Sequence, residues 1–258
     1  MLRSLLEWLS RGVVLKRRLP ADLGGLALYV SPDASLKYWR RDLRNTDPLL
    51  LNAARRLVRP GDIVWDVGAN TGLFSFAAAG LVGKGGQVIA VEPDPWLSKL
   101  LRKSTELNAN SDCAVHVLPL AVGDRAGQAV LNIARRGRAT NFIAGYRPST
   151  QAGGVREEVG VELATLDGML DNWAAPAVLK IDVEGAEAAV LRGAEKMLRD
   201  IRPRIMCEVS DENLQQVTEM LRSAGYVLYD ANQDWPACGE IARCAWNTIA
   251  LPLPGGVT

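Results

Sequence analysis

The amino-acid sequence predicts an α/β protein built on a doubly wound, mostly parallel β-sheet. From residue 60 onward, short apolar runs rich in β-branched residues alternate with helix-length amphipathic segments, which is typical of this class. A glycine-containing loop, residues 68–72, follows the first of these runs, where sheets of this class bind nucleotides. The length of 258 residues, 48% of them hydrophobic, suits one large domain with a small extension.

We expect residues 1–45 to form an extension that precedes the main domain, residues 46–258. Apolar residues recur at helical spacing between Leu2 and Val13, which predicts an amphipathic helix. In the simplest interpretation this helix packs on its own domain; a homodimer contact and a membrane surface are the alternatives. A strand is expected at residues 26–30.

The overall charge does not indicate a nucleic-acid partner, because 30 Lys and Arg balance 29 Asp and Glu. Residues 1–60, however, hold 12 Lys or Arg and 5 Asp or Glu, a net charge of +7 (12 − 5). We interpret this as a solvated face, with an acidic partner or membrane surface as the alternative. The sequence shows neither a transmembrane-length apolar run nor a signal-peptide pattern, and its four cysteines lack zinc-site spacing. We therefore expect a cytoplasmic protein.

The first half of the main domain is predicted element by element from apolar runs and turn residues. Pro48 starts a helix that runs to Leu57, since proline is favoured at the first helical position. Three strands are expected at residues 63–67, 87–91 and 115–120. Helices at 73–81 and 96–108 connect them, because their apolar residues recur at helical spacing.

The second half of the main domain is expected to continue the alternation after an irregular insertion. A further strand at 129–133 is followed by a polar, glycine-containing loop from Arg135 to Val155. The remaining expected strands are 159–163, 177–181, 204–209, 226–229 and 248–251. The remaining expected helices are 166–173, 187–199 and 214–224. No clear helix separates the last two strands, which indicates a hairpin at the edge of the sheet.

The loop Asp66-x-Gly68-x-Asn70-x-Gly72 is the first candidate binding site. A dinucleotide site would require the spacing G-x-G-x-x-G, whereas here Asn70 replaces the middle glycine and the last glycine comes one position early. Asp66 ends the strand, where it would repel a pyrophosphate but attract a cation. S-adenosylmethionine carries a sulfonium and an ammonium group, so it fits this acidic loop better. A simple glycine turn with a helix-capping Asn70 is the alternative.

Three further residues are predicted to complete an adenosine site. Glu92 ends the second strand, where a carboxylate can accept both ribose hydroxyls, although NAD sites use the same contact. Asp124 follows the third strand, within reach of the adenine amino group, and Val122 could flank the adenine ring. A turn role for Asp124 is the alternative.

Four motifs in this order resemble the FkbM family of S-adenosylmethionine-dependent methyltransferases. They are the Asp66–Gly72 loop, Val91-Glu-Pro-Asp, Leu120-Ala-Val-Gly-Asp, and Leu179-Lys-Ile-Asp-Val-Glu-Gly-Ala-Glu, with Thr165–Asp167 and Arg202–Glu208 in support. The similarity covers roughly residues 47–251. It implies a Rossmann-like class I methyltransferase fold, with a seven-stranded, mostly parallel sheet whose last strand is antiparallel. It also implies methyl transfer to a hydroxyl of a sugar, polyketide or other natural product.

The loop after the fourth strand is predicted to face the acceptor. Asp182 is the first candidate for a group that orients the acceptor or removes its proton, and Glu184 is the second. Capping of the next helix is the alternative for Glu184 and for Glu187. Two neighbouring carboxylates also suggest a divalent metal, but no ligand spacing secures one, so the metal is left open and no metal ligands are assigned. Lys180 is interpreted as structural.

The Arg135–Val155 insertion is predicted to supply the acceptor contacts, with Asn141 as a hydrogen-bonding candidate. His116, the only histidine, starts the third strand at the edge opposite the site, so we interpret it as structural. The sequence therefore favours an S-adenosylmethionine-dependent O-methyltransferase for a small-molecule or glycan acceptor. A non-catalytic S-adenosylmethionine-binding module and an N-methyltransferase are the alternatives, and Asp66 and Asn70 argue against an NAD-dependent oxidoreductase.

Overall fold

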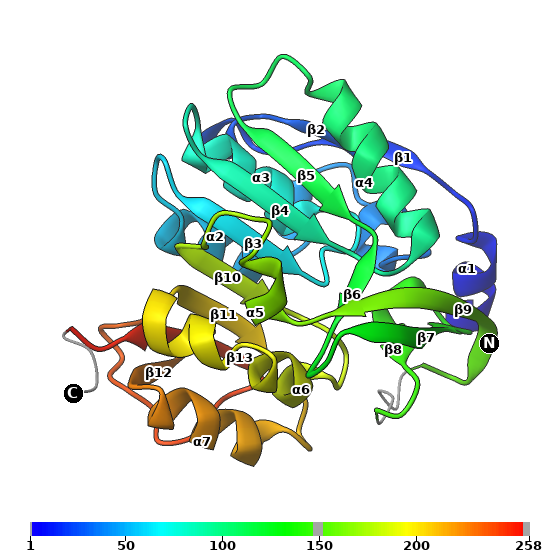
Figure 1. Cartoon of the computed structure of the whole chain (residues 1–258). Coiled ribbons are helices and arrows are strands. Elements are labelled where there is room, and N and C mark those ends of the chain that lie inside the picture. The colour runs from blue at the N-terminus through cyan, green and yellow to red at the C-terminus, as the bar shows by residue number, and fades with distance from the viewer. Residues whose placement is uncertain (1, 147–151, 255–258) are drawn as a thin grey trace.

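A computed structural model describes residues 2–146 and 152–254, with side chains from Leu6 onward (Figure 1). Seven strands form the central sheet in the order β12-β13-β11-β10-β3-β4-β5. Their bounds are β3 (Ile63–Val67), β4 (Gln87–Val91), β5 (Ala114–Leu118), β10 (Val178–Ile181), β11 (Arg204–Glu208), β12 (Tyr226–Asp230) and β13 (Asn247–Pro252). The last strand, β13, is antiparallel to both of its neighbours, whereas the pairs among β11, β10, β3, β4 and β5 are parallel. The predicted sheet and its antiparallel last strand are confirmed.

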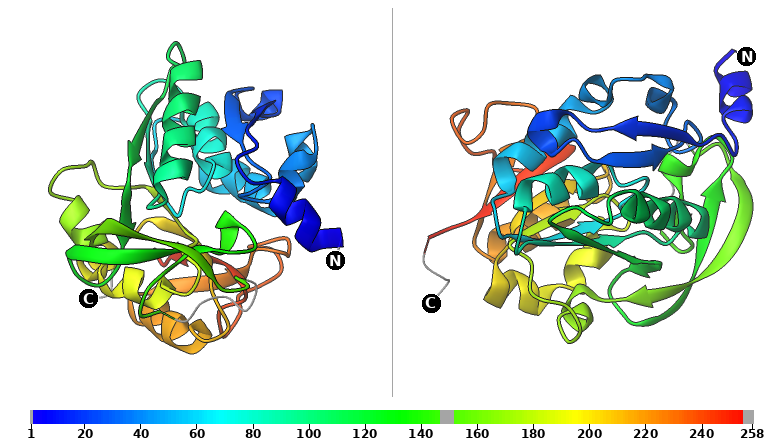
Figure 2. Two further views of the ribbon diagram at one scale, coloured as in Figure 1. Left: turned by 90° about the vertical axis from the view of Figure 1, so that its right-hand side faces the viewer. Right: turned by 90° about the horizontal axis from the view of Figure 1, so that it is seen from above.

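Helices cover both faces of this sheet, as predicted for a doubly wound fold (Figure 2). One face carries α2 (Pro48–Leu57), α3 (Leu73–Val82) and α4 (Pro95–Leu107). The other carries α5 (Leu166–Met169), α6 (Glu187–Arg192) and α7 (Leu214–Ser223). Neighbouring strand residues alternate between the two cores: Val64 packs in the first and Trp65 in the second. Both faces are therefore buried, which explains the nearly continuous apolar runs of the parallel strands.

The helix predicted over residues 187–199 is interrupted. Helix α6 ends at Arg192, and a π-helical turn, η5, follows at Met197–Ile201. A Cβ atom on Gly193 would lie 2.1 Å from the carbonyl oxygen of Gly123, so the two backbones touch at this point. This close approach favours a break between α6 and η5 at glycine.

A second, four-stranded sheet in the order β6-β9-β7-β8 lies beside the carboxyl ends of the central strands. Its strands are β6 (Leu120–Val122), β7 (Gly127–Ala134), β8 (Phe142–Ile143) and β9 (Val155–Ala164). The single strand predicted at 115–120 is wrong, because the chain divides at Pro119 into β5 and β6. Proline has no N–H to continue a ladder, so the second part pairs with β9 instead.

The segment predicted as a loop, Arg135–Val155, contains some regular structure. It holds a 3-10 turn, η4 (Arg138–Thr140), and the short strand β8, which pairs with β7. Residues 147–151 of the predicted loop lie outside the described residues. The sequence pattern could not reveal β8 because two residues are too few to show an alternation.

The N-terminal extension packs on α4. It comprises α1 (Leu2–Leu9), β1 (Leu15–Arg18), η1 (Ala21–Leu23), β2 (Ala27–Val30), η2 (Leu36–Trp39) and η3 (Leu43–Asn45). Strands β1 and β2 form an antiparallel pair, of which only β2 is predicted from the sequence. The backbone N–H of Tyr29 donates to Ser104 Oγ at 2.8 Å, and that of Ala27 to Asn108 Oδ1 at 3.1 Å. The extension is thus joined to the main domain by hydrogen bonds as well as by buried Leu28.

Within the described residues, each helix is too short or too polar to cross a membrane.

Candidate active site

The candidate site lies where the carboxyl ends of β3, β4 and β10 meet. The Gly68 N–H donates to the carbonyl oxygen of Val91 at 2.9 Å, and the Asp182 N–H donates to that of Val67 at 3.0 Å. A Cβ atom on Gly68 would lie 1.8 Å from the Asp182 carbonyl oxygen, and its φ is +78°. The loops after β3 and β10 can therefore approach this closely only with glycine at position 68.

Asn70 and Gly72 shape the turn that leads into α3. Asn70 adopts a left-handed conformation with a φ of 54°, which asparagine tolerates better than most residues. Its backbone N–H donates to Glu92 Oε2 at 2.7 Å. Gly72 precedes α3 with a φ of 90°, and a Cβ there would lie 2.6 Å from Leu101 Cδ2. Position 72 thus favours glycine for two reasons: its left-handed backbone conformation and its close packing against Leu101.

Glu92 holds the glycine loop against the end of β4. One carboxylate oxygen accepts from the Asn70 N–H, and the other accepts from the Asp94 N–H at 2.9 Å. Burial raises the pKa of Glu92 to about 7, although these two backbone donors oppose the shift. Each oxygen keeps a second lone pair that can accept a ligand hydroxyl.

A first pocket of about 610 Å³ opens between this loop and the second sheet. Its polar lining residues are Asn70, Glu92, Arg138, Asn141, Asp182 and Glu184. Its apolar walls include Val91, Leu120, Val122, Leu131, Phe142 and Ile143. An apolar pocket with a few convergent polar groups is the usual form of a small-molecule site.

The structure separates Val122 from Asp124. Val122 is buried and lines the first pocket, where it can flank a flat ring. Asp124, predicted to reach adenine, is not among the described lining residues of that pocket. Its carboxylate pairs instead with Arg125 and Arg192, each at 3.3 Å, because the chain turns outward after β6. The alternative of a turn role therefore fits the placement of Asp124 better.

Asp66 faces a lysine of the protein, whereas the sequence predicts that it contacts the cofactor. Its side chain is fully buried and lines none of the described pockets. Lys180 lies opposite it in the register of β3 and β10, and the Lys180 ammonium is 3.1 Å from Asp66 Oδ1. Asp66 Oδ2 accepts from Ser75 Oγ at 2.5 Å. The lysine thus takes the place expected for a ligand cation, which pattern analysis of the loop alone could not reveal.

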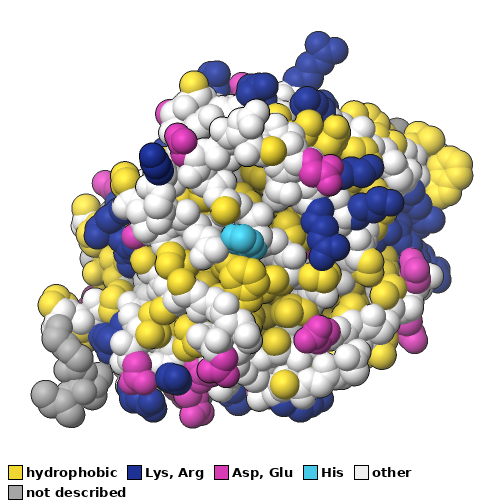
Figure 3. All heavy atoms as spheres, turned by 45° about the horizontal axis from the view of Figure 1, so that its top comes forward, with side chains coloured by type: hydrophobic (Ala, Val, Ile, Leu, Met, Phe, Trp, Pro, Cys, Tyr) yellow, Lys and Arg dark blue, Asp and Glu magenta, His cyan; other side chains and the backbone are white. Residues whose placement is uncertain are grey.

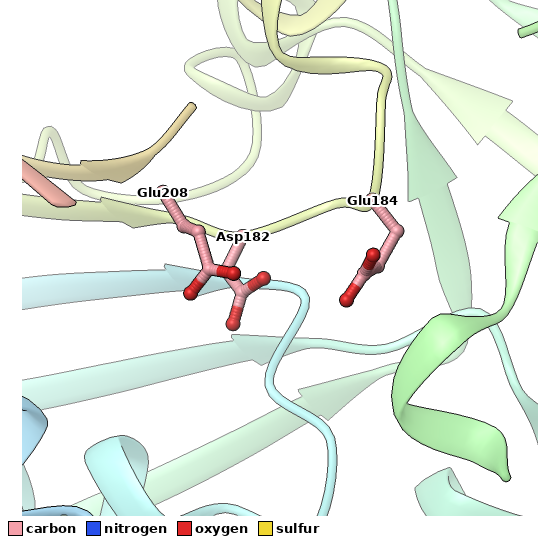
Figure 4. A group of neighbouring side chains, drawn as sticks. All are labelled: Asp182, Glu184 and Glu208. Carbon is pink, nitrogen blue, oxygen red and sulfur yellow. The ribbon is translucent and has the colours of Figure 1, made fainter. Parts of the chain in front are cut away.

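Three carboxylates converge beyond the ends of β10 and β11. Oxygen atoms of Asp182, Glu184 and Glu208 all lie within 4.8 Å of one another. Figure 4 shows the three carboxylates directed toward one space, with Asp182 beside Glu208 and Glu184 facing them. Glu184 holds this position with a φ of 52°, a left-handed conformation that is uncommon for glutamate. The structure therefore brings both predicted acceptor-side residues together and adds Glu208.

The charge state of this cluster is set mainly by burial and by Asp182. Burial and then the Asp182 carboxylate raise the pKa of Glu184 to about 9 and that of Glu208 to about 7. Lys180 lies 3.4 Å from Asp182 Oδ2 and also donates to the Gly68 carbonyl oxygen at 2.7 Å. Burial alone would lower the pKa of Lys180, but the carboxylates of Asp66 and Asp182 outweigh it and raise the pKa. The site thus holds a lysine, Lys180, that stays protonated. Beside it lie Glu208, whose pKa is near neutrality, and Glu184, whose pKa is above neutrality.

A second pocket of about 770 Å³ opens on the other side of these carboxylates. It is lined by Tyr38, Asp47, Phe74, Lys180 and Glu208, among others. The two pockets share four described lining residues, which are Asn70, Ala139, Asp182 and Glu184. Two ligands placed in the two pockets would therefore meet at these residues.

Asn141 lines the first pocket but its side chain already has protein partners. Asn141 Nδ2 donates to Asp94 Oδ2 at 2.8 Å, and Asn141 Oδ1 accepts from the Ala134 N–H at 2.9 Å. Arg138 contacts the same Asp94 oxygen and also donates to Asp33 Oδ2 at 3.1 Å. Asn141, predicted to contact the acceptor, thus lies on the Glu92 side of the first pocket. Its side-chain hydrogen bonds indicate that it holds η4 and β8 in place.

Glu187 and His116 lie outside the reacting space. Glu187 is buried, and its carboxylate accepts from the Gly185 N–H, Ser210 Oγ and Asn213 Nδ2. It therefore joins the loop before α6 to the start of α7 and, among the described contacts, accepts no hydrogen bond from an N–H of α6. His116 lies on β5 against the Trp173 ring, with centroids 5.2 Å apart, and is visible in Figure 3 among hydrophobic side chains. Neither residue lines the first or the second pocket as described.

Sequence reasoning missed Glu208 and Arg138 and underrated Lys180. A usable signal existed for Glu208, because it ends the strand adjacent to β10 and parallel strands present their carboxyl ends at one edge. Lys180 could have been suspected from a charged residue inside an otherwise apolar strand. Nothing in the local sequence shows that Arg138 reaches Asp33, more than 100 residues away.

The polar groups that line the first pocket fit a nucleoside without phosphate groups. Glu92 offers carboxylate oxygens for a ribose diol, and Val122 and Phe142 offer apolar walls for a base. Arg138 is the only Lys or Arg among the described lining residues, and its guanidinium is already paired with two carboxylates. The three clustered carboxylates could orient an acceptor hydroxyl or take a divalent cation, whose preferred ligands are oxygens.

Comparison with known proteins identifies a family. The sequence profile of the methyltransferase FkbM domain matches residues 66–228. The chain is 32% identical over 207 residues to a 31-O-demethyl-FK506 methyltransferase FkbM of Streptomyces tacrolimicus, covering 69% of this chain and 76% of that protein. It is 26% identical over 224 residues to a hexuronic acid methyltransferase AglP of Haloferax volcanii, covering 84% of this chain and 86% of that protein. Among solved structures, it is similar to a methyltransferase FkbM from Methylobacillus flagellatus, with 17% identity, a TM-score of 0.47 and coverage of 85% of this chain and 57% of that chain.

Proposed function

We propose an O-methyltransferase activity for this chain, which belongs to the FkbM family of S-adenosylmethionine-dependent methyltransferases. The acceptor in this proposal is a hydroxyl of a sugar, polyketide or other natural product. The observation that carries the proposal is that two pockets meet at Asn70, Asp182 and Glu184. A methyl donor in one pocket and an acceptor in the other would be in contact only there.

The first pocket is the proposed cofactor site. Glu92 would hold the ribose hydroxyls, Val122 the adenine, and the turn at Gly68 and Asn70 would let the cofactor approach the backbone. When bound, S-adenosylmethionine supplies an activated methyl group on its sulfonium. Asp66 acts indirectly in this scheme, because its carboxylate fixes Lys180 and Ser75 beneath the loop.

The three carboxylates of the second pocket have separate proposed roles. Asp182 orients the acceptor, since one of its oxygens is held by Lys180 and the other is free to accept a hydroxyl hydrogen bond. Glu208, with a pKa of about 7, is suited to take the hydroxyl proton near neutral pH. Glu184, with a pKa of about 9, is protonated at that pH and can donate a hydrogen bond to the acceptor.

The names of the relatives support methyl transfer to an oxygen atom. The kind of acceptor is inferred from the lining of this chain's own second pocket. The printed name of one relative specifies a 31-O-demethyl substrate, and that of the other a hexuronic acid. In this chain the second pocket carries Asp47, Asp182, Glu184 and Glu208 against two lysines, Lys37 and Lys180. Lys37 and Lys180 are already paired with Asp47 and Asp182, so no cation among the described lining residues is left to balance an anionic sugar, and we propose a neutral, hydroxyl-rich acceptor.

Titration calorimetry tests the cofactor part of the proposal. We expect heat of binding with S-adenosylmethionine and none with NAD, and we expect Glu92→Ala to weaken S-adenosylmethionine binding at least about tenfold, since it removes a pair of charge-assisted hydrogen bonds. Glu219→Ala, an exposed glutamate on α7, is the matched control. Binding of NAD in place of S-adenosylmethionine would refute the assignment of the first pocket.

A further inference from the structure

We propose that the N-terminal end of the molecule docks on an anionic membrane surface. The docking surface consists of five exposed apolar residues, Leu6, Trp8, Leu9, Val14 and Trp39, and the basic residues around them. This inference goes beyond methyl transfer; its consequence for the acceptor, given below, rests on the proposed function.

The apolar part of the docking surface is unusually exposed for its residue types. Trp8 has 61% of its surface exposed, Leu9 51% and Trp39 46%. Tryptophan exposed to this extent is typical of surfaces that contact a membrane interface, where the ring lies at the level of the lipid headgroups. Packing of α1 on its own domain would bury its apolar side chains, whereas Leu6, Trp8 and Leu9 are all exposed.

The end of α1 and Trp39 lie side by side although they are 29 residues apart in the chain. Trp39 Nε1 donates to Ser10 Oγ at 3.1 Å, and Ser10 Oγ in turn donates to the Leu6 carbonyl oxygen at 2.7 Å. Trp39 is therefore held against the end of α1, beside Leu6 and Leu9. Hydrophobic side chains protrude at the right-hand edge of Figure 3, next to several Lys and Arg side chains.

Exposed basic residues adjoin the apolar residues in the chain. The exposed basic residues that adjoin them in the chain are Arg11, Lys16, Arg18, Arg40 and Arg41. Within the described residues none of these five is ion-paired to a carboxylate, whereas Lys37 and Arg44 nearby are paired to Asp47 and Asp42. Lys16 and Arg41 each follow an apolar member, Val14 and Trp39, by two residues, hence within about 7 Å along the backbone.

This combination favours a membrane over a second copy of the chain. In a two-fold symmetric dimer the same surface would face itself, so unpaired arginines and lysines would be brought together and repel. An anionic bilayer offers both complements at once, because lipid phosphates attract the basic residues and the headgroup region accepts the tryptophans.

The docking surface lies next to a route into the active site. Glu7 of α1 accepts from Arg136 Nη2 at 3.3 Å, and both residues line a third pocket of about 740 Å³. This third pocket shares Ala34, Ser35, Lys37 and Ala139 with the second pocket. A chain docked through α1 would therefore place the entrance to its acceptor side near the lipid headgroups, and we infer an acceptor that is itself anchored in the membrane.

Vesicle co-sedimentation of the full chain tests the docking. We expect the wild type to bind mixed phosphatidylglycerol–phosphatidylcholine vesicles at least about tenfold more tightly than pure phosphatidylcholine vesicles, and to be released by salt. Trp8→Ser with Leu9→Ser should weaken binding at least about tenfold. Lys16→Glu with Arg41→Glu should weaken it by at least about fivefold, the value of one basic residue at such a surface.

Matched controls carry the same changes elsewhere on the surface. Val130→Ser with Leu253→Ser removes two other exposed apolar side chains, and Lys196→Glu with Arg243→Glu reverses two other exposed charges. Both controls should bind the anionic vesicles as the wild type does. Calorimetry with S-adenosylmethionine should be unchanged in all four variants, which separates a failure of docking from a failure of the proposed function.

Two results would overturn the membrane proposal. One is a wild-type chain that stays in the supernatant with the anionic vesicles at low salt. The other is a dimer in sedimentation velocity that Trp8→Ser with Leu9→Ser converts to a monomer, because a second copy would then cover the surface. A released membrane-anchored acceptor that is methylated as fast as the same acceptor held in vesicles would refute the consequence for the substrate.

Discussion

At the scale of single residues, the site is governed by how three carboxyl groups share one buried space. Asp182 has Lys180 as its partner, while Glu208 accepts a hydrogen bond from Trp246 Nε1 at 3.0 Å. Glu184 has neither a lysine nor a tryptophan at hydrogen-bond distance among the described contacts, and its pKa is raised further than that of Glu208. Similar side chains thus acquire different roles from their surroundings.

Glu208→Gln tests the proposed base. The base acts in its deprotonated form, so we expect the wild-type rate of methyl transfer to rise with pH and to pass its midpoint near pH 7, the pKa of Glu208. The variant should lose this rise and be at least about 100-fold slower at pH 8. The rate is measured from pH 5.5 to 9, with Glu219→Gln as control. A Glu208→Gln variant that keeps the wild-type pH profile would exclude Glu208 as the base.

Glu184→Gln is expected to stabilise the fold at alkaline pH. The unfolded chain releases the Glu184 proton near pH 4.5, whereas the folded chain holds it to about pH 9, so wild-type stability is lost as pH rises through this window. Glutamine carries no such proton, and we expect it to raise the free energy of unfolding by roughly 1–3 kcal/mol at pH 8. Guanidinium unfolding at pH 5 and pH 8 measures the difference. A gain that is equal at both pH values would contradict a raised pKa.

At the scale of elements, the ends of neighbouring strands assemble the site. The glycine loop after β3, Glu92 after β4 and the Asp182 loop after β10 could all be placed from the sequence, because each follows an apolar run at a predictable edge. The pairing of Asp66 with Lys180 could not be placed in this way, because Lys180 lies on another strand, opposite Asp66 in register. The local sequence pattern shows which residues end strands. The side-chain partner of each such residue, however, depends on how distant segments pair in the sheet.

The turn η4 and strand β8 are held over the first pocket by Arg138. Its guanidinium contacts the buried carboxylates of Asp33 and Asp94 and lies 4.8 Å from the centre of the Trp96 ring. This contact joins the N-terminal extension, the start of α4 and the pocket wall. The sequence indicates an insertion at these residues. It could not show how Arg138 holds the insertion in place, because Asp33 and Asp94 lie far from Arg138 in the chain.

Arg138→Ala should loosen this wall. It leaves two buried carboxylates with fewer partners, although Arg156 still pairs with Asp33 and Asn141 with Asp94, so we expect a loss of about 2–3 kcal/mol of stability. We also expect at least about tenfold weaker S-adenosylmethionine binding, with partial recovery in Arg138→Lys. Urea unfolding and calorimetry measure the two effects, and Arg102→Ala on the exposed side of α4 is the control. Unchanged cofactor affinity despite lost stability would show that the wall does not form part of the cofactor site.

At the scale of the whole molecule, the doubly wound fold and the additions to it both line the two pockets: Glu92 and Phe142 line the first, and Lys180 and Tyr38 line the second. The alternation of apolar and amphipathic segments was enough to predict a doubly wound sheet and its helices, whereas the seven strands and the antiparallel last strand were implied by the resemblance to the FkbM family. The alternation was not enough to predict the four-stranded second sheet, whose β6 and β8 are only three and two residues long. The extension likewise contributes Tyr38 to the second pocket through a turn, η2, that has no sequence periodicity.

The central claim is that methyl transfer takes place where the two pockets meet at Asp182. The most direct test incubates the chain with S-adenosylmethionine and a panel of neutral, hydroxyl-rich acceptors, and follows product and S-adenosylhomocysteine together by mass spectrometry. We predict equal amounts of S-adenosylhomocysteine and of an acceptor that has gained one methylene unit of mass at a hydroxyl oxygen. Asp182→Asn should still bind S-adenosylmethionine but transfer at least about 100-fold more slowly. Transfer by Asp182→Asn at the wild-type rate, or cofactor binding by the wild type with no methylation of any hydroxyl acceptor, would contradict this account.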